Sequence, residues 1–409
     1  MDRYDVVVAG GGIGGSGAAT VLARGGLSVC VVEPTTEYPD IVRGEWLAPW
    51  GVAHTMATGL YDVLAAAGGH HVQRHVTFDE RMPAAEALAG SLPLSDMAPD
   101  VPGPLTVRHP VACQALTDAA VAAGATVHRG ATDIELHPGG TLAFTVDGQL
   151  QEASGRMVIG ADGRSSGVRK AIGVELERAE TDHHLAGVLV EGLGFLGDDT
   201  VQYVATEDGR HVLCFPQGGG RARLYLSYGD AQKDRFAGAE RVAAYLGAFE
   251  MGCWPGSEGF RGATVLGPAR GYRSVDSWCE RPFADGVVLL GDAAGHNDPI
   301  IGQGLSLTSA DVRAVTEALL STDDWSPSLF EDYGRERLER MRRFRATAQV
   351  YSLAVAGHTW AREPQVRTAM MENPLVGTCL ATMMVGPYVF PDEVYDQAEL
   401  DRLVAAPAA

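Results

Sequence analysis

The chain has 409 residues, of which 46% are hydrophobic and 21% charged, an ordinary composition for a folded protein with two or three domains. Its formal net charge of -20 at pH 7 argues against a nucleic-acid partner, because such a partner requires a basic surface that releases counterions. No apolar stretch of about 18 residues is free of glycine, proline and charge, so no transmembrane segment is predicted.

The six cysteines are scattered, without a C-x-x-C pair or a His/Cys cluster at metal-ligand spacing. We therefore expect reduced thiols, a cytoplasmic location and no metal site.

A βαβ unit is predicted at the start of the chain. Residues 4–9 (YDVVVA) and 28–33 (SVCVVE) are apolar runs typical of buried parallel strands, and residues 13–24 have helical apolar spacing. A glycine-rich turn, Gly10-Gly11-Gly12-Ile13-Gly14-Gly15, joins the first strand to the helix, and Glu33 ends the second strand. This is the dinucleotide fingerprint in its required context.

The glycine turn and Glu33 are predicted to hold different parts of a dinucleotide. Gly10 permits the tight turn, Gly12 lets the pyrophosphate approach bare backbone, and Gly15 allows close packing of helix on strand. The helix N-terminus offers free N–H groups to the phosphates, and Glu33 accepts hydrogen bonds from ribose hydroxyls. FAD and NAD use the same fingerprint, which alone does not choose between them.

The middle of the chain is predicted to contain a second, antiparallel sheet. Residues 70–104 are irregular and leave the nucleotide domain. Next come a helix at 111–124, strands near 126–129, 133–137, 142–146 and 156–159, and then alternating segments from 188 to 227. The glycine run at 218–220 lies between two of these segments and is predicted to be a hairpin turn.

A second cofactor motif, GDAAGHNDPIIGQG, follows the buried strand predicted at 286–290, and helices are predicted at 304–320 and 328–351. Asp292 stands at the end of that strand, and an ionised aspartate only accepts hydrogen bonds. It therefore suits the ribityl or ribose hydroxyls of an extended dinucleotide whose phosphates lie on the glycine turn.

With these motifs in order, the chain resembles the single-component FAD-dependent monooxygenases of the para-hydroxybenzoate hydroxylase type. The third matching motif is GADGRSSGVR, from Gly160 to Arg169. At two positions the chain departs from the family: Gly295 stands where histidine is usual, and Ser306 where asparagine is usual. His296 is interpreted as structural. The resemblance assigns the FAD site to Gly10, Gly12, Ile13, Gly14, Gly15, Glu33, Arg43, Arg108, Asp162, Gly291, Asp292, Pro299, Gly302, Gln303 and Gly304.

The resemblance implies an α/β fold in which a doubly wound, Rossmann-like FAD domain carries an inserted antiparallel substrate sheet and a helical C-terminal segment. The expected FAD-binding domain comprises residues 1–70, 105–176 and 272–352, the substrate-binding domain 71–104 and 177–271, and the C-terminal segment 353–409. A monomer or a homodimer is expected.

The chemistry that the resemblance implies consumes NADPH or NADH, which reduces FAD, and O₂, which forms a flavin C4a-hydroperoxide that hydroxylates an aromatic, electron-rich small molecule. The helix start at Gly302-Gln303-Gly304 would stabilise negative charge on reduced flavin, and Pro299 with Ile300 and Ile301 would keep water away. Side chains pointing inward from the second sheet are predicted to line the substrate pocket: Tyr203, His211, Leu213, Phe215, Tyr225 and Ser227. No motif identifies the catalytic base.

Three alternatives remain open from the sequence. A reductase acting on isoprenoid double bonds would use the same motifs without oxygen chemistry. A flavin-dependent halogenase is disfavoured, because it needs a lysine between flavin and substrate and no lysine precedes Lys170. A non-catalytic flavin-binding protein is disfavoured by the intact Gly-Asp and Asp-Gly motifs.

Overall fold

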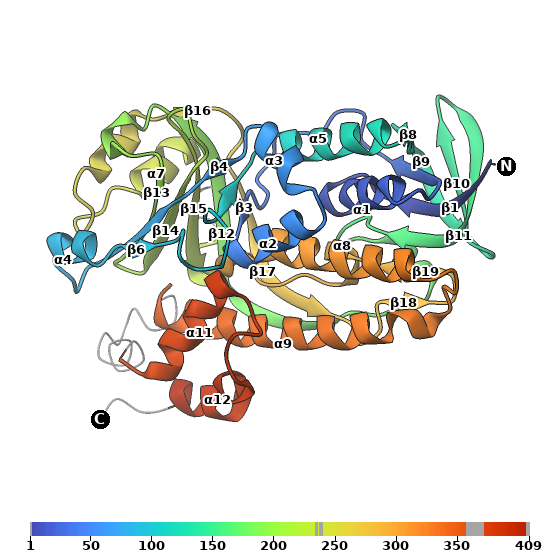
Figure 1. Ribbon diagram of the computed structural model, residues 1–409. Coiled ribbons are helices and arrows are strands. Elements are labelled where there is room, and N and C mark those ends of the chain that lie inside the picture. The colour runs from blue at the N-terminus through green and yellow to red at the C-terminus, as the bar shows by residue number, and fades with distance from the viewer. Residues whose placement is uncertain (1, 234–235, 237–239, 357–371, 406–409) are drawn as a thin grey trace.

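The computed structural model describes residues 2–233, 236, 240–356 and 372–405. Two sheets form the body of the molecule: a mainly parallel one near the N-terminus and a mainly antiparallel one beside it, in which only β5 (Arg74–Asp79) and β13 (Val201–Glu207) pair in parallel among the described strands (Figure 1). Parts of the predicted C-terminal segment 353–409, namely 357–371 and 406–409, lie outside the described residues.

The first sheet has a parallel core. Its strands lie in the order β19 (Val287–Leu289), β11 (Gln149–Gly160), β1 (Asp2–Ala9), β2 (Val29–Glu33) and β8 (Thr126–Arg129). Antiparallel strands extend it: β18 (Phe283–Ala284) pairs with β19, and β9 (Thr132–His137) and β10 (Thr141–Val146) form a meander with the first half of β11.

Both faces of this sheet are covered, which explains the uninterrupted valines of β1. Val6 and Val8 pack against helices, whereas Val7 and Ala9 pack on the opposite side with residues of the β9–β10 meander. The covering helices are α1 (Ile13–Arg24), α5 (His109–Ala122) and α8 (Gly304–Ser321), and α1 contacts both of the others (Figure 1). The predicted doubly wound FAD-binding fold is confirmed.

The second sheet is built from the two chain segments that were expected to form the insertion. Its order is β16 (Thr264–Val265), β12 (Glu177–Glu191), β15 (Arg221–Gly229), β14 (Arg210–Pro216), β13 (Val201–Glu207), β5 (Arg74–Asp79) and β6 (Leu92–Pro93). Strand β17 (Arg270–Trp278) also pairs with β12, so the boundary expected at residue 271 falls inside a strand. We propose to place that boundary after Trp278.

The outer face of this sheet is covered by α7 (Arg241–Gly247) and the residues that follow it. Aromatic side chains of α7 and of these residues form a separate hydrophobic core with Tyr203 and Phe78 of the sheet. Figure 1 shows α4 (Ala84–Ala89) at the far edge, beside β6. The inner face is thereby left to meet the FAD-binding half.

The remaining elements connect the two halves. Small strands β3 (Trp46–Leu47), β4 (His70–His71) and β7 (Leu105–Thr106) form a third sheet, with α2 (Pro49–Ala57) and α3 (Tyr61–Ala66) between them. The long helix α9 (Glu331–Ala354) runs beneath the parallel sheet to α11 (Pro374–Val385) and α12 (Gln397–Ala405) (Figure 1). None of the described helices has the length and apolarity needed to cross a membrane.

Candidate active site

A cavity of about 1110 Å³ runs from the glycine turn of β1–α1 to the inner face of the second sheet. It brings together most of the residues predicted from sequence. Those that line it are Gly10, Gly12, Ile13, Gly14, Glu33, Arg43, Asp162, Gly291, Asp292, Pro299, Gly302 and Gly304 on the FAD-binding side, and Leu213, Phe215 and Tyr225 on the sheet side. Gly15, Arg108, Gln303, Tyr203, His211 and Ser227 are not among its lining residues.

The three fingerprint glycines have different surroundings. Gly10 has a φ of +97°, and a Cβ there would lie 2.5 Å from the carbonyl oxygen of Ala161. A Cβ on Gly15 would lie 1.8 Å from the carbonyl oxygen of Gly10, whereas one on Gly12 would meet no atom of the described residues within 4 Å. Gly10 and Gly15 are therefore required by the fold, while the space over Gly12 is open to a ligand.

Glu33 is fixed by backbone donors at the end of β2. Its two carboxylate oxygens accept from the N–H groups of Gly11, at 2.5 Å, and Thr35, at 2.8 Å. The carboxylate thus ties β2 to the glycine turn, and it lines the cavity with acceptor capacity remaining for a ribose hydroxyl.

Asp162 caps the short helix α6 (Gly167–Ala171). Its Oδ2 accepts from the N–H groups of Gly167, at 2.7 Å, and Val168, at 3.2 Å, and its Oδ1 accepts from the hydroxyl of Ser166. The side chain therefore shapes the turn through which the Asp-Gly segment reaches the cavity.

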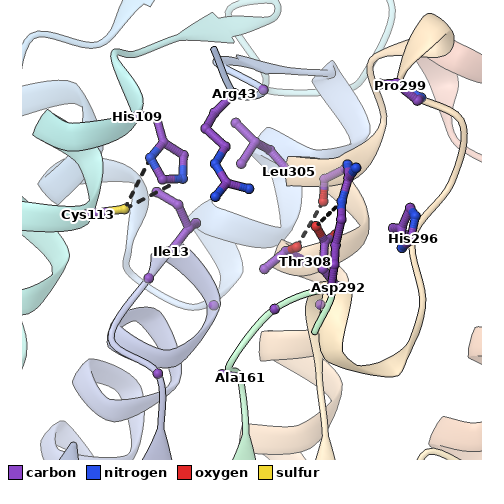
Figure 2. A pocket seen from close by; sticks show the side chains of 18 of the residues that line it. Ile13, Arg43, His109, Cys113, Ala161, Asp292, His296, Pro299, Leu305 and Thr308 are labelled. Carbon is purple, nitrogen blue, oxygen red and sulfur yellow. Dashed lines mark hydrogen bonds and ion pairs between the residues drawn. The ribbon is translucent and has the colours of Figure 1, made fainter. Parts of the chain in front are cut away.

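Asp292 lies in the turn that follows strand β19, and its side chain is 32% exposed (Figure 2). Its Oδ2 accepts from Nε of Arg164 at 3.2 Å, so the carboxylate reaches the cavity paired with a cation. Arg164 comes from the Asp-Gly segment, which places both family motifs at one point of the wall.

A buried ion pair holds the turn that carries Asp292. Asp311 of α8 accepts from the N–H of Gly291 at 2.9 Å and from Nε of Arg337 at 2.9 Å. Arg337 in turn donates to the carbonyl oxygens of Gly291, Ala294 and Gly295 at 2.8–3.0 Å. Although burial opposes the charge, Asp311 keeps the pKa of Arg337 raised.

The Pro299–Ile301 turn lies along the same wall, just before α8. The carboxylate of Asp298 accepts from the N–H of Ile300 at 3.0 Å, and Gly302 has a φ of +65°. His183 of the second sheet lies 2.9 Å from Asp298. Burial lowers the pKa of His183, but Asp182 and Asp298 outweigh it and raise that pKa to about 9.

Gln303, predicted to contact flavin, points away from the cavity. Its Oε1 accepts from the indole N–H of Trp50 at 2.8 Å, and its Nε2 donates to the carbonyl oxygens of Ile301 and Met383. The side chain of Gln303 thus joins α2 to α11, and the predicted contact through the backbone N–H groups at the start of α8 stays a prediction.

Arg108, also predicted to contact the cofactor, does not line the cavity. The residue immediately precedes α5, and its guanidinium is bonded to Asp40, which also accepts from Arg223 at 3.0 Å. Arg43, by contrast, lines the cavity, and Figure 2 shows its side chain extended between His109 and Leu305 toward Ile13.

The loop that carries Arg43 is held against the second sheet by buried charges. Glu45 and Arg223 are each 2% exposed and form a two-pronged pair at 2.8 Å, and the hydroxyl of Tyr225 donates to the carbonyl oxygen of Arg43 at 2.6 Å. Tyr225 is therefore engaged with this loop, and burial raises its pKa well above the usual value.

Tyr203 lies on the opposite face of the sheet from the cavity, so its predicted pocket position is wrong. In the β13–β14 register, Tyr203 pairs with Cys214 and Val204 with Leu213, so Val204 shares the cavity face with Leu213. Tyr203 instead stacks on Phe78 and Trp254 in the outer core.

His211 is on the correct face but lies behind another side chain. Its Nε2 is 3.0 Å from the hydroxyl of Tyr351, a cavity residue on α9, and its Nδ1 is 2.9 Å from the hydroxyl of Thr206. Ser227 is also buried, and its hydroxyl donates to the carbonyl oxygen of His184. His296 lines the cavity but bonds through Nδ1 to Ser277 at 2.8 Å, and burial lowers its pKa to about 4.

Sequence reasoning missed several cavity residues, notably Trp46, His75, Gln202, Tyr351 and Met383. Alternation along β13 would have indicated Gln202 and Val204 together, had the register with β14 been known. The others come from the short strand β3, from β5 and from the C-terminal helices α9 and α11, which carry no motif.

The FAD binding domain family matches residues 3–348. This chain belongs to that family. The family match confirms the predicted FAD cofactor and the resemblance to single-component FAD-dependent enzymes, and the open space over Gly12 beside Glu33 and Asp292 fits the group. This FAD binding domain protein is an FAD-dependent oxidoreductase.

Relatives of this FAD binding domain protein have two kinds of named activity. It is 28% identical over 320 residues to digeranylgeranylglycerophospholipid reductase 2 of Methanococcoides burtonii, covering 74% of this chain and 71% of the relative. It is 27% identical over 370 residues to 3-amino-4-hydroxybenzoate 2-monooxygenase of Streptomyces cremeus, covering 88% and 91%. Among solved structures, anhydrotetracycline hydroxylase of Streptomyces rimosus superposes with a TM-score of 0.72 at 23% identity, covering 95% and 77%.

Proposed function

We propose that this protein is an FAD-dependent monooxygenase that consumes NADPH or NADH and O₂ and hydroxylates a phenolic or similarly electron-rich aromatic small molecule. The single observation that carries this proposal is the continuous cavity, which joins the dinucleotide turn to an apolar sheet face. A pocket of this kind can hold an organic substrate beside the reactive end of an extended dinucleotide.

The residues of the cofactor half have separable proposed roles. The open turn at Gly12 and the N-terminus of α1 would receive the pyrophosphate, Glu33 a ribose, and Asp292 the hydroxylated chain. Arg43 would add a cation beside the phosphates. Bound FAD would accept electrons from the nicotinamide and would transfer one oxygen atom of O₂ to the substrate.

The Pro299–Ile301 turn forms the cavity wall beside the proposed reaction site, which lies in front of the N-terminus of α8, and this wall would exclude water. Ile300 and Ile301 are 2% and 4% exposed and belong to a core cluster with Trp46 and Trp50. The Pro299–Ile301 turn therefore offers a rigid apolar surface, while α8 begins immediately after it and directs its N-terminal N–H groups toward the same region.

The named relatives support this reading. The relative from Streptomyces cremeus is a 3-amino-4-hydroxybenzoate 2-monooxygenase, and the solved structure from Streptomyces rimosus that shares the fold is an anhydrotetracycline hydroxylase. The test is aerobic turnover of the FAD-loaded protein with phenols, indoles and polycyclic aromatics. We expect substrate-stimulated NAD(P)H oxidation and a product that gains one ¹⁸O atom from ¹⁸O₂. Equal product formation without O₂ would refute the proposal.

A second candidate is reduction of an isoprenoid double bond, which the relative from Methanococcoides burtonii favours. That activity would form product under argon, with two hydrogens added and no oxygen. The same assay run anaerobically therefore separates the two candidates.

We further propose a cytoplasmic protein that acts as a monomer or a homodimer. All six cysteines are free, and five of them are buried, consistent with a reducing environment. Size-exclusion chromatography with light scattering would determine the oligomeric state.

A further inference from the structure

The inner face of the second sheet is mainly apolar and aromatic, and the amide of Gln202 is one of its few polar groups. Val204, Leu213 and Tyr225 form a buried cluster with Val42 and Leu185, and all five line the cavity. Gln202, two residues before Val204 on β13, also lines the cavity and is only 1% exposed.

The orientation of the Gln202 amide follows from its partners. The indole N–H of Trp46 can only donate, and it lies 2.8 Å from Oε1 of Gln202, so that atom is the amide oxygen. Nε2 then donates to Nδ1 of His75 at 2.9 Å, which leaves the proton of His75 on Nε2, facing the hydroxyl of Thr77 at 2.9 Å.

This network leaves one donor for a ligand. An amide nitrogen carries two hydrogens, and His75 takes one of those on Gln202. Among the described residues, no atom accepts the second hydrogen of this amide nitrogen. The amide cannot rotate to hide it, because rotation would place N–H groups against the indole of Trp46.

Trp46 also places this donor next to the proposed reaction site. A Cβ on Gly302 would lie 3.4 Å from Cε3 of Trp46, so one edge of the indole lies close to the turn that precedes α8, and the indole N–H donates to Gln202. A substrate on the sheet face would therefore lie between Gln202 and the Pro299–Gly302 turn.

Among the described residues, the cavity-lining side chains of the sheet face carry no formal charge. These residues come from β5, β12, β13, β14, β15 and β17, and none is Asp, Glu, Lys or Arg. The one titratable base among them is His75, whose pKa burial lowers to about 4, so it is neutral near pH 7. Arg223 lies on this sheet but is already neutralised by Glu45 and Asp40. The cavity-lining Arg164, whose guanidinium lies 5.9 Å from the ring centroid of Tyr272, is likewise paired with Asp292.

We propose that Gln202 is a specificity-determining residue whose amide N–H binds a carbonyl or other neutral oxygen acceptor of an uncharged aromatic substrate, and that this face rejects benzoate-type anions. The proposal rests on the proposed function and narrows its substrate class. Burying a carboxylate here without a cation would be strongly unfavourable. A neutral ketone would satisfy the donor at little cost in desolvation.

The test measures ligand binding to the FAD-loaded protein through the change in the visible flavin spectrum. The probes are 2-acetylnaphthalene, its alkene analogue 2-isopropenylnaphthalene, and 2-naphthoate. We expect the ketone to bind about tenfold more tightly than the alkene, as one net hydrogen bond provides, and at least about tenfold more tightly than the anion.

Substitution at position 202 then isolates the donor. In Gln202→Leu the preference for ketone over alkene should fall to about one. Gln202→Leu also leaves the indole N–H of Trp46 without its acceptor, so Gln202→Glu serves as a second variant. It keeps an oxygen for the indole but replaces the amide donor by an acceptor, and ketone binding should therefore weaken further. Gln149→Leu, an exposed residue of β11, is the matched control and should leave all ratios unchanged.

Several outcomes would overturn the proposal: naphthoate binding as tightly as the ketone, a ketone that does not bind at millimolar concentration, or an unchanged ketone preference in Gln202→Leu. Failure to retain FAD would instead refute the proposed function, and it is read from the spectrum before any probe is added.

Discussion

Arg337 and Asp311 form a buried ion pair, Nε to Oδ2 at 2.9 Å, directly beneath the turn that carries Asp292. Arg337 is 2% exposed and Asp311 0% exposed, so neither charge can regain water if the other is removed. The pair joins α8, α9 and the Gly291–Gly295 turn into one unit.

Arg337→Met should therefore destabilise the protein by about 2–4 kcal/mol, because it leaves three buried carbonyl oxygens without their donor and removes one of the two arginines that pair with Asp311, the other being Arg340 at 2.7 Å. It should also weaken FAD binding by loosening the turn. Urea denaturation and flavin fluorescence titration measure the two effects. Arg335→Met, an exposed position of the same helix, is the control. A free energy of unfolding within about 1 kcal/mol of wild type would contradict the role of the pair.

Gly12→Asp should remove FAD binding without harming the apoprotein. No atom of the described part of the chain lies within 4 Å of a Cβ at this position, so the side chain fits the fold, but its charge opposes the pyrophosphate. Like-charge contact of this kind costs several kcal/mol, so we expect binding to weaken by about a hundredfold or more.

In contrast to Gly12→Asp, Gly15→Ala should destabilise the apoprotein itself, and the two variants are compared in the same experiments. Its Cβ would lie 1.8 Å from the carbonyl oxygen of Gly10, so the apoprotein should lose about 1–3 kcal/mol of unfolding free energy. Thermal melts of both apoproteins, with flavin retention during purification, separate the effects. Gly12→Asp that retains flavin normally would show that the site is misassigned.

Asp292→Ala should weaken FAD binding about tenfold while leaving the fold intact, since its side chain is 32% exposed and its protein partner, Arg164, is exposed too. The loss comes from one acceptor for the hydroxylated chain of the cofactor. Titration of apoprotein with FAD gives the dissociation constant, and Asp285→Ala, exposed on the loop before β19, is the control. Equal affinities in the two variants would exclude Asp292 from the site.

Asp276 gives the stability a pH dependence. Burial and the neighbouring Asp298 carboxylate raise its pKa to about 7, against about 3.9 in the unfolded chain. The folded state therefore holds a proton that the unfolded state releases, and this contribution to stability falls as pH rises from about 4 to 7. Asp276→Asn keeps an oxygen for the N–H of Asp298 but cannot titrate.

We expect the unfolding free energy of Asp276→Asn to decline less than that of wild type between pH 4.5 and 7.5, measured by urea denaturation at about one-unit steps in that window. Parallel curves for the two proteins would mean that Asp276 is ionised throughout.

Much of the FAD half could be read from sequence because its constraints are local. The strand, glycine turn and helix around Gly10 follow from the apolar run and the turn, and the hairpin at residues 218–220 follows from its glycines. The predicted helices near 111–124 and 304–320 correspond to α5 and α8 within about two residues.

The errors on the substrate side arise from relations between distant segments. Whether Tyr203 or Gln202 faces the cavity depends on how β13 pairs with β5 and β14, and a shift of one residue exchanges the two faces. Likewise, nothing near Gln303 in the sequence indicates Trp50 or the carbonyl of Met383, which draw its side chain away.

The double contact of Trp46 bears on how this enzyme can be re-engineered. If the proposed roles hold, changes at Trp46 or Gln202 should disturb both the Pro299–Gly302 turn and substrate recognition, so gains in one should be coupled to losses in the other. Val204 and Leu213 have apolar neighbours on the same face and no hydrogen-bonded side chain. Mutant libraries that seek new substrates should therefore begin at these two positions.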